Sequence, residues 1–292
     1  MKKIAVIGAG NVGTVLGLAL FNKGYTLVGA VTKSSEGRAE AAKQLQCPVY
    51  SQPHQASREA EIVFITTPDR VIEDVCQQMA REGGFYKGQI VIHCSGAHSS
   101  EILQSSRKAG AWALSMHPLQ TFPGTEAGLR ALPGTFFAVE GDTGALPTAG
   151  DLVNALGGEM LPISTEMKTL YHAAACVACN YLTSLLDGAL RMYEQAGVSR
   201  EQAVKALYPL ISRTLENIKE AGPEQALTGP IARGDTTTVK AHVEELQRFL
   251  PELLPFYQIM GQQTVGLALR KGTLTETQAE NINYYLKQGG TD

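Results

Sequence analysis

The sequence has few of the features that mark secreted or membrane-bound proteins. Its 292 residues include only five cysteines, an odd and irregularly spaced set that does not suit a disulfide framework. Its apolar stretches are interrupted by Gly, Asn or Thr before they reach the roughly 20 residues of a membrane span. A strand starts within the first residues, so we expect no signal or transit peptide. These absences predict a cytoplasmic protein.

Charge and ligand patterns exclude other partners. The 25 Lys and Arg against 28 Asp and Glu give a formal net charge of −3, which offers no positive excess for nucleic acid or an anionic membrane. His93, Cys94 and His98 lie close in sequence, but a further ligand at metal-site spacing is missing. We therefore expect no nucleic acid, membrane or metal among the ligands.

Three glycines near the N-terminus form the first functional pattern. An apolar strand ends in G-x-G-x-x-G, and a segment of helical periodicity, residues 14–23, follows. This order of strand, turn and helix is typical of dinucleotide binding rather than of a plain Gly-rich turn, because the glycines let backbone approach a pyrophosphate and helix pack on strand. The N–H groups at the helix start then face the phosphates. The predicted contacts are Gly8, Gly10, Asn11, Val12 and Gly13.

The end of the second predicted strand, residues 25–31, indicates which dinucleotide is bound. An NAD-binding unit places an acidic residue there for the ribose 2′-hydroxyl. Here Thr32, Lys33 and Ser34 follow the strand, and the first acid is Glu36. Because hydroxyls and a Lys can hold a 2′-phosphate that a carboxylate would repel, we predict NADP (NADPH) as the cofactor. The alternative is that these are ordinary loop residues.

Later strands end in polar turns that belong to the same crevice. Ligand crevices lie at the carboxyl ends of parallel strands, so the turn Thr66-Thr67-Pro68 is predicted to border the ribose and diphosphate. Ser95, with Gly96, follows another strand and is predicted to lie near the nicotinamide. The alternation of strands and helices over about 160 residues predicts an α/β fold with a Rossmann doubly wound, mostly parallel sheet.

The pattern becomes helical after residue 163. We expect helices over residues 166–196, 199–221, 238–249, 253–270 and 275–287, with Pro209 kinking the second. The prediction is two domains: an NADP-binding domain over residues 1–163 and an all-α domain over residues 164–292.

The first of these helices carries a polar stripe. Residues 168–183 are apolar around most of the helix circumference, which predicts a buried helix at the domain junction. His172, Cys176 and Asn180 recur at i, i+4 and i+8 and so share one face. Buried polar groups need partners, so the stripe faces either satisfied neighbours in the core or a cleft and its ligand. We favour the cleft, because the helix follows a dinucleotide-binding domain.

Four segments together resemble the Rossmann-like proteins that carry a DUF2520 C-terminal domain: residues 8–13, 117–122, 172–180 and 227–235. That family is similar to a 6-phosphogluconate dehydrogenase-like group that includes ketopantoate reductase, pyrroline-5-carboxylate reductase and the β-hydroxyacid dehydrogenases. The resemblance implies an NADP-dependent oxidoreductase whose helical domain contributes to the substrate site and forms a homodimer. Ketopantoate reductase has a catalytic Lys with Asn four and eight residues later. His172, Cys176 and Asn180 stand there in this chain, so only the last Asn is retained.

The chemistry implied is hydride transfer to a carbonyl or imine carbon of a small substrate, such as a ketopantoate-like 2-oxo acid. An imidazole can supply the accompanying proton near neutrality. His172 is the first candidate for this proton donor and His117 is the second.

The resemblance also gives a set of substrate-binding candidates. Asn180 would orient the substrate, and Arg233 would bind its carboxylate, unless Arg233 is a solvated loop charge. Gln120, Thr228 and Asp235 are assigned to the same pocket, although the last two can instead cap and turn the chain. The competing hypothesis for the whole protein is a non-catalytic NADP-binding sensor or interaction protein.

Overall fold

The computed structural model describes residues 2–288, which form two units, Met1–Cys179 and Asn180–Asp292. The division falls inside a long helix rather than at the predicted residue 163. The reason is that the start of this helix is bonded to the sheet: Thr165 Oγ1 donates to the Glu140 carboxylate at 2.9 Å. Each unit is a folded body with its own apolar core.

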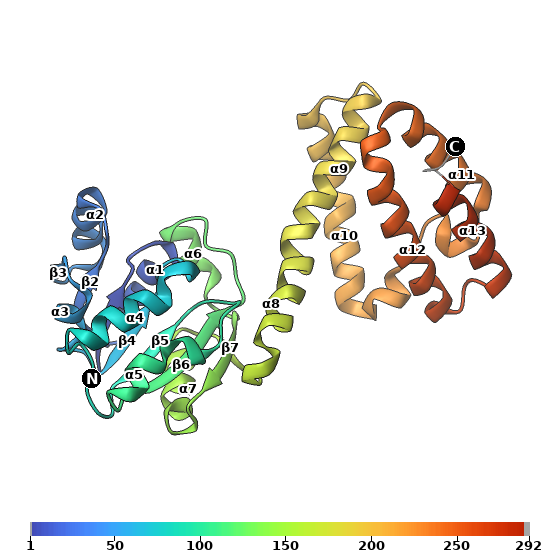
Figure 1. Cartoon of the computed structure of the whole chain (residues 1–292). Coiled ribbons are helices and arrows are strands. Elements are labelled where there is room, and N and C mark those ends of the chain that lie inside the picture. The colour runs from blue at the N-terminus through green and yellow to red at the C-terminus, as the bar shows by residue number, and fades with distance from the viewer. Residues whose placement is uncertain (1, 289–292) are drawn as a thin grey trace. The chain divides into compact units, whose positions relative to one another are not determined.

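An eight-stranded sheet organises the first unit, with strands in the order β3-β2-β1-β4-β5-β6-β7-β8. Every neighbouring pair is parallel except β6 and β7. The strands are β1 (Lys3–Ile7), β2 (Thr26–Val31), β3 (Val49–Tyr50), β4 (Ile62–Ile65), β5 (Ile90–His93), β6 (Trp112–Pro118), β7 (Phe136–Gly141) and β8 (Glu159–Pro162). The predicted mostly parallel, doubly wound sheet is confirmed (Figure 1).

Helices cover both faces of this sheet, and each face has its own core. In β1, Val6 belongs to one apolar cluster and Ile7 to the other, because successive strand residues point to opposite faces. The helices of this unit are α1 (Asn11–Asn22), α2 (Ser35–Leu45), α3 (Pro53–Ser57), α4 (Ile72–Arg81), α5 (Gln104–Lys108), α6 (Thr125–Ala131), α7 (Leu146–Ala155) and α8 (Lys168–Cys176).

The second unit is helical over the residues described. Its helices are α9 (Leu182–Gln195), α10 (Arg200–Ala226), α11 (Thr236–Phe249), α12 (Leu254–Lys271) and α13 (Glu276–Gln288). Ser199 caps α10 as expected, since its hydroxyl accepts from the Gln202 N–H. The expected kink at Pro209 is not where the helix breaks. The non-helical residue is Gly222, with φ of 78°, a value that glycine adopts at little cost.

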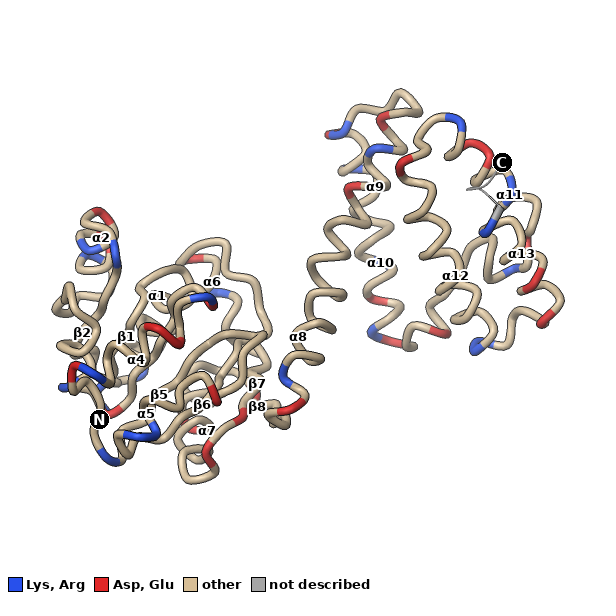
Figure 2. Tube along the Cα trace, viewed as in Figure 1, with Lys and Arg blue, Asp and Glu red and all other residues tan. Residues whose placement is uncertain are grey.

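The helix that the sequence predicted to be buried is largely exposed. The stretch Thr165–Gln195 is long and apolar enough, by length and composition alone, to cross a membrane, and 6% of its apolar window is buried. The expectation that no apolar stretch reaches that length is therefore wrong for this helix. Figure 2 shows the trace between α8 and α9 without charged residues, and residues 169–186 hold no Lys, Arg, Asp or Glu.

Candidate active site

The turn between β1 and α1 has the geometry that its glycines predict. Gly8 has φ of 107°, and a Cβ there would lie 2.7 Å from the Thr67 backbone nitrogen. Around Gly10, by contrast, no heavy atom lies within 4 Å of the Cβ position, so backbone is open to a ligand at that point. Gly10 is the N-cap of α1, whose first turn holds no acidic residue. The helix start is therefore free to accept negative charge.

A cleft of about 1020 Å³ opens beside this turn. It is large enough for a dinucleotide, since ligand pockets typically span about 300–1,000 Å³. The predicted cofactor contacts that line it are Gly8, Gly10, Asn11, Val12, Thr32, Lys33, Thr66, Thr67 and Pro68. Gln120, which was predicted for the substrate pocket, lines the same cleft. Gly13 packs against Val6 instead, which is the helix–strand contact that the third glycine serves.

The end of β2 places cations beside the cleft. Lys33 lines the cleft, and the neighbouring Arg38 guanidinium donates to the Lys33 carbonyl at 3.2 Å. Ser34 does not line it; its hydroxyl caps α2 by accepting from the Gly37 N–H at 2.9 Å. Arg38 was not among the residues predicted from sequence, because it lies beyond the strand end and only the helix returns it to Lys33.

A smaller cavity of about 90 Å³ continues the cleft toward β5. Val12, Thr66 and Thr67 line both spaces, and Cys94 and Ser95 close the smaller one. The Thr67 hydroxyl is buried without a hydrogen-bond partner among the described residues. Ser95 donates to Asp69 at 2.7 Å, so the loop after β5 is fixed at the wall of this cavity.

The imidazole rings of two histidines pack against each other beside Gly96, the residue after Ser95. The rings of His117, on β6, and His172, on α8, pack edge to face with centroids 5.9 Å apart. Gly96 makes this approach possible: a Cβ at Gly96 would overlap His172 Nδ1 and would lie 2.9 Å from His117 Nε2. The Tyr171 hydroxyl lies 2.9 Å from His117 Nδ1. We call Gly96, His117, Tyr171 and His172 the imidazole cluster.

The two imidazoles differ in environment. Burial, together with the nearby charge of Lys168, lowers the pKa of His117 to about 4, so that ring is neutral at pH 7. His172 keeps its Nδ1 buried and without a hydrogen-bond partner among the described residues, while its Nε2 lies 3.6 Å from the Cys176 sulfur. This ring nitrogen faces Gly96, and a buried polar atom without a partner requires an explanation, of which an absent ligand is one.

Lys168, like Arg38, is a charged residue of the site that was not predicted from the sequence. Its side chain is 1% exposed, and its Nζ has no hydrogen-bond partner among the described residues. Burial lowers the pKa of this amine from 10.5 to about 8. The Nζ lies 5.6 Å from the centre of the Tyr171 ring. Lys168 precedes His172 by four residues, so the i, i+4 spacing of the polar stripe would have placed Lys168 on the same face of the helix.

The carboxylate of Glu140 raises the pKa of Lys168 by its charge, but it does not hydrogen-bond to the amine. The buried carboxylate of Glu140, at the end of β7, accepts from the Ser100 N–H at 2.6 Å, from the Ser100 hydroxyl and from the Thr165 hydroxyl. Those bonds fix the start of α8 on the sheet. Glu140 therefore positions the helix, and the Lys168 amine is left buried without a hydrogen bond among the described residues.

His93 has a structural role in the same region. It is fully buried, and burial lowers its pKa to about 3. Its Nε2 lies 3.0 Å from the Ser99 carbonyl, and its Nδ1 accepts from the Ser95 N–H at 3.2 Å. The neutral ring thereby holds the loop that carries Ser95 and Gly96.

The remaining predicted residues belong to the second unit. Asp235 caps α11, accepting from the Thr238 N–H at 3.0 Å and from the Thr238 hydroxyl at 2.6 Å, which is the capping alternative. Thr228 and Arg233 are exposed. Asn180 is exposed as well and lies in the π-helical turn Val177–Tyr181, where the wider turn breaks the α-helical spacing assumed for the stripe.

Comparison with known families and structures supports the two-part reading of the chain. A model of a Rossmann-like domain matches residues 1–118, and a model of a domain of unknown function, DUF2520, matches residues 135–264. The chain thus combines the two domains that its motifs predicted. A comparison with curated proteins gives no match.

Solved structures share the fold. Protein TM1727 from Thermotoga maritima is 25% identical, with 92% of this chain and 99% of that one covered and a TM-score of 0.72. An imine reductase from Pseudomonas sp. is 19% identical, with 98% and 92% covered and a TM-score of 0.61. Pyrroline carboxylate reductase from Plasmodium falciparum, solved with NADP bound, is 13% identical, with 97% and 98% covered and a TM-score of 0.58.

Proposed function

We propose that this protein is an NADP-dependent reductase of a small carbonyl or imine compound. The observation that carries the proposal is the unpaired His172 Nδ1 at Gly96, on the loop that also closes the cavity continuous with the glycine-turn cleft. The similar solved structures of an imine reductase and of a pyrroline carboxylate reductase support the same reaction class.

The cleft fits a dinucleotide by its own geometry. Backbone at Gly10 is open to a ligand, and the start of α1 can hold the diphosphate. Lys33 at the cleft and Arg38 beside it supply the positive charge that a 2′-phosphate needs, which is why we propose NADP. When bound, the cofactor supplies a hydride to the substrate carbon.

The chain's own residues supply the proton. His172 gives a proton to the oxygen or nitrogen of the reduced double bond and regains one from solvent. His117, neutral because its pKa is about 4, has no imidazolium proton to give at pH 7. It holds the His172 ring edge to face and is itself held by Tyr171. This division of roles favours His172 over His117 as the donor.

Lys168 contributes electrostatically. A buried ammonium without a hydrogen bond lowers the energy of negative charge that develops nearby, more strongly than it would in water. Its pKa of about 8 keeps it mostly charged at pH 7. We therefore assign Lys168 the role of stabilising the reduced, electron-rich oxygen or nitrogen before His172 protonates it.

The test is a panel of 2-oxo acids and cyclic imines assayed by loss of absorbance with NADPH and with NADH. We expect oxidation of NADPH with at least one substrate and a preference for NADPH over NADH. A protein that binds NADPH with micromolar affinity but oxidises it with no member of the panel would favour the sensor hypothesis. A preference for NADH would contradict the 2′-phosphate assignment.

A further inference from the structure

The His117 side chain makes a single hydrogen bond among the described residues, and that bond uses only one of its ring nitrogens. The Tyr171 hydroxyl lies 2.9 Å from His117 Nδ1, whereas Nε2 has no bonded partner in the part of the chain that the structure describes. The ring is neutral at pH 7, because burial and the charge of Lys168 lower its pKa to about 4. A neutral imidazole has one donor and one acceptor nitrogen, so the contact with Tyr171 decides which nitrogen carries the proton.

A count of unpaired polar groups assigns that proton to Nε2. If the Tyr171 hydroxyl donates to Nδ1, the Nε2–H of His117 is left without an acceptor. If Nδ1–H instead donates to the phenol oxygen, the hydroxyl proton and the Nε2 lone pair are both left unpaired, since Tyr171 has no other hydrogen bond among the described residues. The first arrangement leaves fewer unpaired groups in a half-buried site and is therefore the more stable. Burial raises the pKa of Tyr171, so the phenol keeps the proton that it donates.

The charged groups around the ring agree with this assignment. Lys168 and His172, both on α8, lower the pKa of His117 through their charge, and Asp69 raises it. Lys168 is the cation that could donate to an unprotonated Nε2, yet its Nζ has no hydrogen-bond partner among the described residues. An ammonium has no lone pair with which to accept from Nε2–H. The absence of a bond between them is therefore what the Nε2–H form predicts.

The free Nε2–H lies where the imidazole cluster meets the loop after β5. A Cβ built on Gly96 would lie 2.9 Å from His117 Nε2 and would overlap His172 Nδ1, so both nitrogens face the same point of the loop. Nδ1 of His172 is buried, whereas the His117 side chain is partly exposed. The preceding residue, Ser95, lines the smaller cavity of the cleft. A donor without an acceptor at such a place requires an explanation, and an atom of a ligand supplies one.

The alternative is that the contact between Tyr171 and His117 only fixes α8 to the sheet. Other hydrogen bonds already make that attachment. The Glu140 carboxylate, on β7, accepts from the Ser100 N–H at 2.6 Å and from the hydroxyl of Thr165, which lies just before α8, at 2.9 Å. The start of α8 therefore does not depend on Tyr171 alone, and the effect of its hydroxyl on the His117 ring is the property that remains to be explained.

We propose that Tyr171 is a positioning residue that holds His117 as a neutral Nε2–H donor directed at the substrate. The inference rests on the reductase function proposed above. The Nε2–H donates a hydrogen bond to the oxygen or nitrogen of the double bond and polarises it for hydride addition at carbon, as neutral imidazoles do in other enzymes. His117 keeps its proton throughout, and His172 transfers the one proton that the product gains.

The first experiment observes the tautomer directly. Two-dimensional NMR of the full chain labelled with ¹⁵N-histidine distinguishes protonated from unprotonated ring nitrogens, and His117→Gln identifies the His117 signals. At pH 7 we expect a protonated Nε2 and an unprotonated, hydrogen-bonded Nδ1. Tyr171→Phe should shift the Nδ1 signal, because its hydrogen bond is lost. A wild type with the proton on Nδ1 would overturn the inference, whether or not the protein turns over a substrate.

The second experiment measures kcat on the best substrate of the panel. Tyr171→Phe should lower kcat about tenfold, the effect of one hydrogen bond. His117→Asn should lower it by at least about 100-fold, because the Asn amide reaches only the position of Nδ1. His117→Gln should be at least about tenfold more active than His117→Asn, because its amide N–H reaches the position of Nε2. Equal activity of these two variants would contradict an Nε2–H donor, as would an unchanged kcat in folded Tyr171→Phe.

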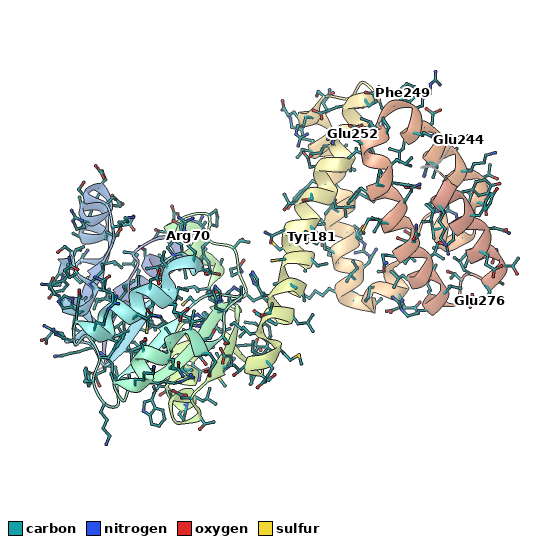
Figure 3. All side chains as sticks on the ribbon, viewed as in Figure 1. Arg70, Tyr181, Glu244, Phe249, Glu252 and Glu276 are labelled. Atoms are coloured by element: carbon teal, nitrogen blue, oxygen red, sulfur yellow. The ribbon has the colours of Figure 1, made fainter. Side chains whose placement is uncertain are left out.

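The helical unit provides a matched control. The Tyr257 hydroxyl lies 2.8 Å from His242 Nδ1, and the two rings pack edge to face as those of Tyr171 and His117 do. His242 lies on α11, the helix that also carries the Phe249 labelled in Figure 3. Tyr257→Phe should change the His242 signals and leave kcat unchanged. A loss of kcat as large as that of Tyr171→Phe would show that removing a buried hydroxyl is enough, and would overturn the positioning role.

Failure of this inference can be told apart from failure of the proposed function. A protein that oxidises NADPH with no member of the panel but shows the Nε2–H form of His117 overturns the reductase function, and with it the role of the donor in catalysis. A protein that reduces a substrate but carries the His117 proton on Nδ1 retains the function and overturns the inference. Circular dichroism melts establish that each variant is folded.

Discussion

Replacing Lys168 with Met removes a buried charge while keeping an unbranched side chain of similar length. The wild-type amine is 1% exposed, and its pKa falls from 10.5 to about 8 because burial disfavours the charged form. A shift of this size corresponds to about 3 kcal/mol of cost to the folded state when the amine is protonated. We therefore expect Lys168→Met to raise the free energy of unfolding at pH 7 by up to about 3 kcal/mol.

The pH dependence of this effect follows from proton linkage. Below pH 8 both the folded and the unfolded chain carry the proton, so the wild type bears the whole cost. Between about pH 8 and 10.5 the unfolded state binds more protons than the folded state. The free energy of unfolding of the wild type therefore rises with pH and approaches that of the variant. The difference between the two proteins should close above pH 10.5.

The assay is urea unfolding followed by fluorescence. The single Trp of the chain, Trp112, lies on β6, so its emission reports the unit that contains Lys168. Lys205→Met, at an exposed residue with a surface ion pair, is the control and should change stability little. If Lys168→Met is instead less stable than the wild type at pH 7, the ammonium has a stabilising partner and the electrostatic reasoning is wrong. The pH profile of kcat/KM gives a second measurement. In the wild type kcat/KM should fall above pH 8 as Lys168 loses its proton, and in Lys168→Met this decrease should be absent.

Three further predictions concern individual contacts. Gly96→Ala should displace the His172 ring, because a Cβ would overlap its Nδ1, so turnover should fall while NADPH binding measured by fluorescence is retained. Lys33→Glu should raise the KM for NADPH by about tenfold or more, by loss of a charge-assisted hydrogen bond, with little effect on the KM for NADH. Asp235→Ala should lower the thermal midpoint of the helical unit, because α11 loses its cap, whereas Asp235→Asn should retain most of it.

Local patterns predicted the glycine turn and the sheet well. The strand β1, the positive φ of Gly8 and the position of Thr66 and Thr67 follow from rules that operate within a few residues and from the parallel order of strands. The same rules brought His117 to the carboxyl end of β6. They did not single out Arg38 beside Lys33 or Lys168 beside Tyr171, although both contacts are local in sequence. The burial of Lys168 depends on how α8 packs against the sheet, which local spacing does not report.

The prediction that helix 168–183 is buried was wrong for a physical reason. Apolar composition indicates that a face is covered, but it does not say by what. In this chain the exposed Leu170 and Val177, at 68% and 57%, show that the cover is not supplied by the elements around them. The spacing of Asn180 was misjudged for a different reason: a π-helical turn leaves no plain signature in a single sequence.

The central claim is that the His172 imidazole supplies the proton for NADPH-dependent reduction. The most direct measurement compares NADPH oxidation by the wild type and by His172→Ala on the best substrate of the panel, with NADPH affinity measured separately and His242→Ala as the control. We predict a loss of at least about 100-fold in kcat at unchanged NADPH affinity, with the control fully active. Undiminished turnover in His172→Ala would contradict the account.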